Sequence, residues 1–97
     1  MDNRYYLIIL YDFYGELLND KQREYFEDYY FNNLSLGEIS ENVGVSRNAI
    51  HKNIKGSEEK LYFYEEKLGL YQKRKFMEKL LLNDDIKVIK EKIRELY

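Results

Sequence analysis

The stretch that decides the fold is SLGEISENVGVSRNAIHKNI, residues 35–54. Ser35 and Glu38 form the S-x-x-E pattern of a capping box, which satisfies free N–H groups at the start of a helix. Gly44 falls where the chain must turn, because glycine adopts a positive φ without steric cost. Ser46 is placed to cap a second helix. The pattern predicts a helix-turn-helix, a two-helix unit with which many regulators enter a DNA groove.

Apolar residues recur at positions that would face inward between these two helices. They are Ile39, Val43, Val45, Ala49 and Ile50. Nine residues after Gly44, where motifs of this type bury an apolar residue, stands Asn53. This side chain either faces outward or is a buried amide that needs hydrogen-bond partners.

Composition points to one mostly helical domain. The chain has 97 residues, of which 44% are hydrophobic and 35% charged, with no proline and five glycines. That length suits a single domain, and the absence of proline favours helices with short connections. We therefore expect one all-α helix-turn-helix domain over 1–97, with its core at about 19–70 and C-terminal helices over 71–97.

Helical spacing also predicts the elements around the motif. A first helix is expected from about Asn3 to Leu18, with Tyr6, Leu10, Phe13 and Leu17 on one stripe. A second begins after Asn19, whose capping-box partner is Gln22, and ends at a turn formed by Asn32 and Asn33. The second motif helix is expected to be long, ending at Gly69, with a possible bend at Gly56. A fifth helix is expected over 71–82. A sixth, capped by Asn83 or Asp84, carries a stripe of Ile86, Ile89, Ile93 and Leu96.

The first helix is apolar on more than one side, which one small core can hardly cover. We therefore expect a homodimer that forms through this N-terminal helix, with Leu7, Tyr11 and Tyr14 in the contact. The longest apolar run, Tyr5–Tyr11, has seven residues. A membrane span needs roughly 20, and no signal-peptide pattern surrounds the run. We expect no membrane span and a cytoplasmic location.

Charge is unevenly distributed along the chain. Residues 1–33 carry 3 Lys and Arg against 7 Asp and Glu, whereas residues 71–97 carry 8 against 5. A basic tail and an acidic head allow three interpretations: contact of the tail with a polyanion, head-to-tail contact between subunits, or ordinary solvated helix faces.

The second motif helix supplies the first candidate binding surface, for DNA. Its outward residues are Arg47, Asn48, His51, Lys52 and Lys55. Arg47 and Asn48 would reach base edges, since Arg pairs well with guanine and Asn with adenine. Lys52 and Lys55 would hold phosphates.

The basic tail supplies the second candidate surface, for RNA or an acidic protein. Its cations are Lys73, Arg74, Lys75 and Lys79, followed by Lys87, Lys90 and Arg94 on the last helix. Tyr71 and Phe76 lie nearby and could stack on exposed bases.

An enzyme is the least favoured class. His51 is the only histidine, and the chain has no cysteine with which to build a disulfide, a thiolate metal site or a Cys–His pair. No helix carries a metal-ligand spacing of histidines and carboxylates. We expect no catalytic residues, no metal and no cofactor.

Over half of the chain resembles a known family. The matching pieces are LNDKQREY at 18–25, LSLGEI at 34–39, GVSRNAI at 44–50, NIK at 53–55 and YEEKLGL at 64–70. These resemble the YlxM family of small bacterial helix-turn-helix proteins. The resemblance implies a fold similar to region 4 of bacterial sigma factors. It also implies a link to the signal recognition particle pathway, because family genes sit beside those of the targeting GTPases, and it implies no catalytic residues.

Overall fold

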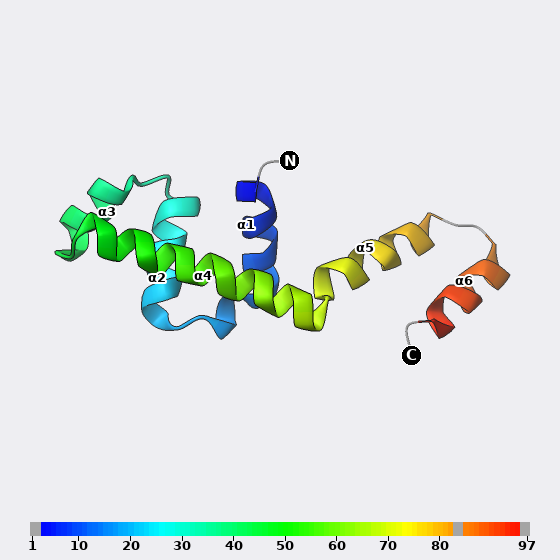
Figure 1. Cartoon of the computed structure of the whole chain (residues 1–97). Coiled ribbons are helices and arrows are strands. Elements are labelled where there is room, and N and C mark those ends of the chain that lie inside the picture. Colours follow the sequence, from blue (N-terminus) through cyan, green and yellow to red (C-terminus); the bar gives the residue numbers. More distant parts are fainter. Residues whose placement is uncertain (1–2, 83–84, 96–97) are drawn as a thin grey trace.

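The computed structural model describes residues 3–82 and 85–95, and in this part it is helical throughout, with no strand (Figure 1). The elements are α1 (Asn3–Tyr14), the 3-10 helix η1 (Gly15–Leu17), α2 (Asp20–Tyr30), α3 (Leu36–Val43), α4 (Arg47–Leu68), α5 (Leu70–Leu81) and α6 (Ile86–Arg94). The predicted all-α class and the long second motif helix are confirmed.

The molecule is elongated, with extents of 58 × 21 × 20 Å. Helices α1–α4 pack together, and we call this part the core. Helices α5 and α6 project beyond it, and we call them the arm (Figure 1). The radius of gyration is 17.7 Å, whereas a compact chain of this length would have about 12–13 Å. The arm therefore lies largely outside the packed part of the chain.

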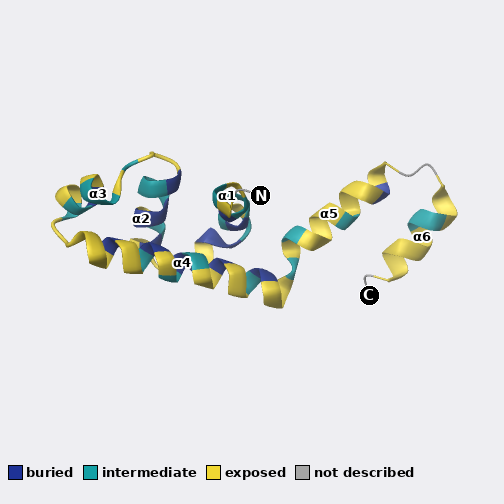
Figure 2. Cartoon of the chain, turned by 45° about the horizontal axis from the view of Figure 1, so that its top comes forward, coloured by how far each residue is buried: buried dark blue, intermediate teal, exposed yellow. Residues whose placement is uncertain are grey.

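Helix α4 is the central element of the core, and α1, α2 and α3 all pack against it. Figure 2 shows buried residues where these three helices meet α4 and mostly exposed residues along the arm. The core side chains are Leu7, Leu10, Tyr14, Leu18, Tyr25, Phe26, Tyr30, Ile39, Ile50, Ile54 and Leu61.

Helix α1 lies across α4 and buries more of its surface than its sequence suggested. Leu7 and Tyr14, predicted to form a dimer contact, are buried in the chain's own core. Tyr11 is half-buried, with its ring stacked on Phe26 at 4.5 Å between centroids. The prediction that Leu7 and Tyr14 present an interface is therefore wrong, whereas Tyr11 keeps part of its side chain at the surface. The wide apolar stripe of α1 instead packs against neighbouring helices on two sides.

Helix α1 also ends earlier than expected. The α-helix stops at Tyr14 and the chain continues as η1, which leaves Leu17 exposed instead of on the buried stripe. Gly15 lies so close to Tyr11 that a Cβ there would be 2.9 Å from the Tyr11 ring. Only glycine leaves room for this close approach.

The predicted helix ends are confirmed where the signal is local. Asn19 and Gln22 form a reciprocal capping box, and Asn33 adopts a left-handed φ of 55° after α2. Helix α4 runs through Gly56 without interruption to Gly69. Asn83 and Asp84, the expected caps of α6, lie outside the described residues. Within them, Asp85 caps α6 by accepting a hydrogen bond from the backbone N–H of Lys87 at 2.9 Å.

A buried carboxylate holds the joint between α4 and α5. Glu65 is 6% exposed and accepts a hydrogen bond from the Tyr14 hydroxyl at 2.5 Å. It also accepts from the backbone N–H groups of Tyr71 at 3.1 Å and Gln72 at 3.2 Å, in the first turn of α5. The Leu70 N–H donates to the Tyr14 oxygen at 3.0 Å. Glu65 and Tyr14 thus supply the cap that Gly69, which has no polar side chain, cannot give.

The arm keeps its apolar residues largely uncovered. Phe76 and Leu80 on α5 face Val88 on α6 around a small cavity. The isoleucine stripe predicted on α6 forms no core, because Ile86 and Ile93 are exposed. Leu96 lies outside the described residues. Among the helices described, none combines the length and hydropathy required to cross a bilayer.

Candidate nucleic-acid interface

The helix-turn-helix is built as its sequence predicts. The Ser35 Oγ accepts from the Glu38 N–H, and a Glu38 carboxylate oxygen accepts from the Ser35 N–H, each at 3.1 Å. The Ser35 backbone N–H first, and then the Ser35 hydroxyl, stabilise the Glu38 carboxylate and hold its pKa below the usual range. Gly44 has φ 74° and ψ 24°, so its predicted positive φ is confirmed. The Ser46 Oγ accepts from the Ala49 N–H at 3.1 Å and begins α4.

Two of the predicted inward residues do not pack between the helices. Ala49 is exposed, and Val45 is 37% exposed in the turn instead of filling the space. Ile39 and Ile50 alone bury fully there. For Asn53 the buried alternative holds, because its side-chain oxygen is buried and has no hydrogen-bond partner among the described residues.

The five predicted DNA-contacting residues share one exposed face of α4. They are Arg47, Asn48, His51, Lys52 and Lys55. At 100° per residue they cover about 140° of the helix circumference. Ile50 and Ile54 lie just outside this arc, beyond its Arg47 edge, and are buried in the core. The face is about 12 Å long at 1.5 Å per residue, and a B-DNA major groove is about 12 Å wide.

Two glutamates follow this face, but one of them is already bound within the chain. Glu58 accepts a hydrogen bond from the hydroxyl of the buried Tyr30. Burial first, and then this bond, raise the pKa of Tyr30 well above its usual value. Glu59 is exposed and marks the end of the positive face. No carboxylate of the described residues lies within 4 Å of Arg47, Lys52 or Lys55.

Arg47 does not project freely from α4. Its guanidinium lies against Gly37 in α3, where an added Cβ would be 2.8 Å from Nη2 and 3.0 Å from Cζ. Gly37 thus leaves the space in which Arg47 rests. His51 and Lys55 line a cleft of about 250 Å³ with Tyr30 and other residues of α2–α4. Sequence reasoning missed Gly37, although a glycine in the first turn of a short helix is a costly residue that calls for a reason.

The basic tail is organised differently, because two of its four cations are held by neighbouring rings. The Arg74 guanidinium lies 4.8 Å from the centroid of Phe13 and 5.5 Å from that of Tyr71, and it pairs with Glu78 at 3.6 Å. The Lys75 ammonium lies 5.1 Å from the Tyr71 centroid. Lys73 and Lys79 are exposed.

The two aromatic residues predicted to stack on bases also have partners within the chain. Tyr71 is half-buried between Tyr6 and Phe13, whose ring centroids lie 5.6 and 6.3 Å away. Phe76 is half-buried against α6. Both rings are therefore only partly accessible to a base in this arrangement.

Three tyrosine–glutamate pairs and one arginine were not found from the sequence. The pairs are Tyr11–Glu27, Tyr14–Glu65 and Tyr30–Glu58. Arg4 caps the end of α2 by donating to the Tyr29 and Tyr30 carbonyl oxygens at 3.1 and 2.9 Å. These contacts join residues 16 to 51 positions apart, and only the YEEKLGL stretch, which contains Glu65, stood out beforehand. No cluster of three or more potential metal-ligating side chains occurs in the described ranges.

Comparison with known proteins places this geometry in a family. A family model described as "Putative helix-turn-helix protein, YlxM / p13 like" matches residues 1–96. A UPF0122 protein of Caldanaerobacter subterraneus subsp. tengcongensis is 54% identical over 78 residues, which cover 80% of this chain and 67% of that protein. One from Thermoanaerobacter sp. is 47% identical over 96 residues, or 97% of this chain and 82% of the relative. One from Oceanobacillus iheyensis is 52% identical over 91 residues, or 90% and 87%.

Proposed function

This chain belongs to the YlxM / p13-like family of helix-turn-helix proteins, and on that premise we propose that it is a non-enzymatic regulator that binds duplex DNA. The observation that carries the proposal is the exposed face of α4, where Arg47, Lys52 and Lys55 lie together with no carboxylate within 4 Å among the described residues. Phosphate contacts supply most of the affinity for DNA, so unpaired cations on a rigid helix favour this ligand.

The roles of the side chains follow from their positions on α4. Lys52 and Lys55 hold phosphates. Asn48 and His51, in the first two turns, point at base edges. Arg47 reaches a base or a phosphate by leaving its place against Gly37, which requires only rotation of a flexible side chain. The protein acts in the cytoplasm, and the family resemblance suggests the signal recognition particle pathway as its context.

An adaptor that binds signal recognition particle RNA or its GTPase through the tail is the alternative. The tail carries more cations than the motif face, but Arg74 and Lys75 already contact rings of this chain. Binding through the tail would therefore rest first on Lys73 and Lys79.

Fluorescence anisotropy with labelled duplex DNA at two salt concentrations tests the proposal. Lys52→Ala should weaken binding to any duplex and lower the slope of log K against log salt by about 1. Lys67→Ala is the matched control, because Lys67 is an exposed lysine at the other end of the same helix. It should bind like the parent chain.

A second set of variants separates the motif from the tail. Changing Lys73, Arg74 and Lys75 together to Gln should leave duplex binding nearly unchanged. If this triple change abolishes binding to signal recognition particle RNA while Lys52→Ala has no effect on any ligand, the adaptor function replaces the DNA-binding one. Equal binding by all variants would contradict both.

A further inference from the structure

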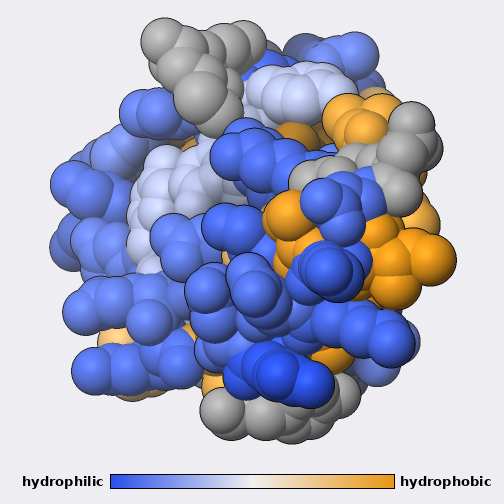
Figure 3. Space-filling model, turned by 90° about the vertical axis from the view of Figure 1, so that its right-hand side faces the viewer, coloured by the Kyte–Doolittle hydropathy of each residue, from blue (hydrophilic) through white to orange (hydrophobic). Residues whose placement is uncertain are grey.

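The end of α5 and the start of α6 expose large aliphatic side chains to solvent. Leu81 and Leu82 are 85% and 87% exposed, and Ile86 is 66% exposed. Seen along the arm, hydrophobic side chains gather on one side of the molecule among hydrophilic ones (Figure 3). Monomeric proteins rarely leave adjoining apolar residues uncovered in this way, and such a patch marks a contact surface.

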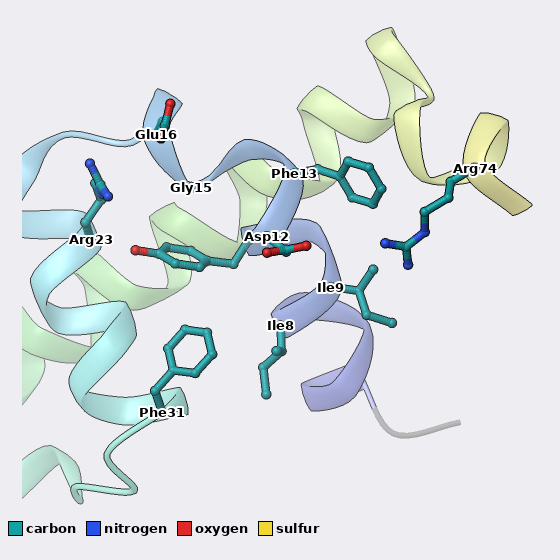
Figure 4. Close-up of a pocket in the computed structure, with 10 residues that line it drawn as sticks. Ile8, Ile9, Asp12, Phe13, Gly15, Glu16, Arg23, Phe31 and Arg74 are labelled. Atoms are coloured by element: carbon teal, nitrogen blue, oxygen red, sulfur yellow. The ribbon is translucent and has the colours of Figure 1, made fainter.

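This exposed surface continues along α5 to the core. Leu70, Arg74, Met77 and Leu81 follow one another at spacings of four, three and four residues, so they lie on one side of the helix. The three apolar members are 40%, 46% and 85% exposed. Arg74, near the root of the arm, also lines a groove on the core (Figure 4).

The groove lies between α1, η1, the two ends of α2 and the root of α5, and has a volume of about 620 Å³. Its apolar lining comes from Ile8, Ile9, Phe13 and Phe31. Asp12 and Glu16 lie at its exposed edge, and in the described chain neither has a cation within 4 Å. Figure 4 shows Ile9, Phe13 and Arg74 on one side of the groove and Phe31 with Arg23 on the other.

Charge indicates what could occupy this groove. Helices α5 and α6 carry eight Lys and Arg against two Glu. Residues 3–30 carry three Lys and Arg against six Asp and Glu. Two arms packed side by side would bring cations against cations, whereas an arm on the α1–α2 side of the core would bring cations against carboxylates. Within the groove, Arg74 is paired with Glu78, and Arg23 lies near the Tyr11 hydroxyl and the Glu27 carboxylate. The two arginines are thus already compensated.

A chain cannot place its own arm in its own groove, because the groove adjoins the root of that arm. The hydrogen bonds of Glu65 to Tyr71 and Gln72 fix the direction in which α5 leaves the core. In Figure 1 the arm extends away from α1. An occupant with the same chemistry as the arm must come from another molecule.

We propose that this occupant is the arm of a second copy of the chain. Two chains exchange arms about a two-fold axis, so that each arm lies along the partner's groove and covers its leucines on the partner's isoleucines and phenylalanines. Helix α5 has 12 residues and so spans about 18 Å, the length of α1. This contact does not depend on the ligand of the α4 face.

Light scattering after size-exclusion chromatography at micromolar protein gives the mass of each variant. The parent chain should be a dimer. Leu81→Ser with Ile86→Ser on the arm, and separately Ile9→Lys in the groove, should each weaken dimerisation more than about tenfold. Leu17→Ser is the matched control, because Leu17 is an exposed leucine that lies outside the arm and is not among the residues that line the groove. It should leave the mass unchanged.

Mixing the two weakened variants distinguishes arm exchange from other dimers. A mixed dimer retains one unaltered arm on one unaltered groove, so the mixture should dimerise more tightly than either variant alone. If the groove variant remains a dimer and only the arm variant is monomeric, the arms pair with each other and the proposal is wrong. A monomeric parent chain would also overturn it.

A third variant does not depend on any buried or half-buried side chain. Lys87, Lys90 and Arg94 are exposed on α6, so changing all three to Gln removes their charge without removing a buried side chain. The dimer should then dissociate several-fold more readily at low salt, and the difference from the parent should shrink as salt screens the charges. No difference at low salt would remove the electrostatic basis of arm exchange.

Discussion

Two positively charged helical regions of this chain, the first half of α4 and the arm, differ in whether their apolar residues are buried or exposed. On the first half of α4, Ile50 and Ile54 are buried behind the cationic face. On the arm, Met77 and Leu81 lie at the surface among the cations. A cationic face over a packed core suits a polyanion, which needs only charge and hydrogen bonds. A cationic face mixed with aliphatic side chains suits a protein surface. Net charge alone would not have separated the two.

The largest difference in the free energy of unfolding should come from the same substitution, Leu→Ala, made once in α4 and once in the arm. Leu61, on α4, is fully buried, so Leu61→Ala should lower the free energy of unfolding by about 2–5 kcal/mol at every protein concentration. Leu81→Ala should cost less than about 0.5 kcal/mol in dilute solution and more only where copies associate. Urea denaturation at two protein concentrations checks both. Equal losses at high dilution would mean that the arm is packed within its own chain.

The joint between the two regions should give the next largest effect. Glu65→Leu leaves the Tyr14 hydroxyl and the Tyr71 and Gln72 N–H groups without their acceptor, and should lower the free energy of unfolding by about 3 kcal/mol. Glu66→Leu is the control at the exposed neighbouring position and should be within about 0.5 kcal/mol of the parent. The same urea titration measures both. A Glu65→Leu chain as stable as the control would show that the arm does not need this joint.

A backbone change tests the motif side of the comparison. Gly44 has a φ of 74°, so Gly44→Val should cost more than about 1 kcal/mol because a β-branched residue is strained there. Gly56 lies within α4, where an added Cβ meets nothing within 4 Å. Gly56→Ala should therefore raise the free energy of unfolding by up to about 1 kcal/mol. Thermal denaturation should show a lower Tm for Gly44→Val and a higher Tm for Gly56→Ala. Shifts of the same sign in both variants would contradict the prediction.

The smallest effect concerns alkaline pH. Burial, and then the hydrogen bond to Glu65, raise the pKa of Tyr14 from 10.0 to about 12. The unfolded chain loses this proton first, so the contribution is complete below pH 10 and is lost as pH rises from 10 to about 12. Tyr14→Phe should flatten the fall in stability over that range. An identical pH profile for parent and variant would show that Tyr14 titrates normally.

Much of the fold could be predicted because its signals are local. Ser35, Asn19 and Ser46 cap helices that start within three residues of them, and Gly44 and Gly69 mark ends that need a positive φ. Burial was harder to predict. Ala49 and Leu17 fit an apolar period but lie at the surface, because a period shows which residues share a helix face and not which element, if any, packs against that face. The apolar period of the arm was visible too, but the sequence did not show that Leu81, Leu82 and Ile86 lie exposed in the described chain.

In the candidate site, too, features set by local sequence could be predicted and features set by packing between helices could not. Exposure of Arg47, Asn48, His51, Lys52 and Lys55 follows from helical phase once Ile50 is placed inside, so the face could be predicted. The position of Arg47 against Gly37 could not, because it depends on how α3 crosses α4. The acceptor role of Glu65 depends on Tyr14, 51 residues away, a separation that no local pattern spans.

Helix α4 is one uninterrupted rod of 22 residues, about 33 Å long. Its first turns carry the cationic face and its last turns carry Glu65. The rise and rotation of one helix therefore determine how these two features are placed relative to each other. Each residue added between them would advance the arm by about 1.5 Å and turn it by about 100° relative to that face. The length of α4 therefore sets both the distance and the angle between the two surfaces, and a chain that keeps the same angle between them must change the length of α4 by whole turns.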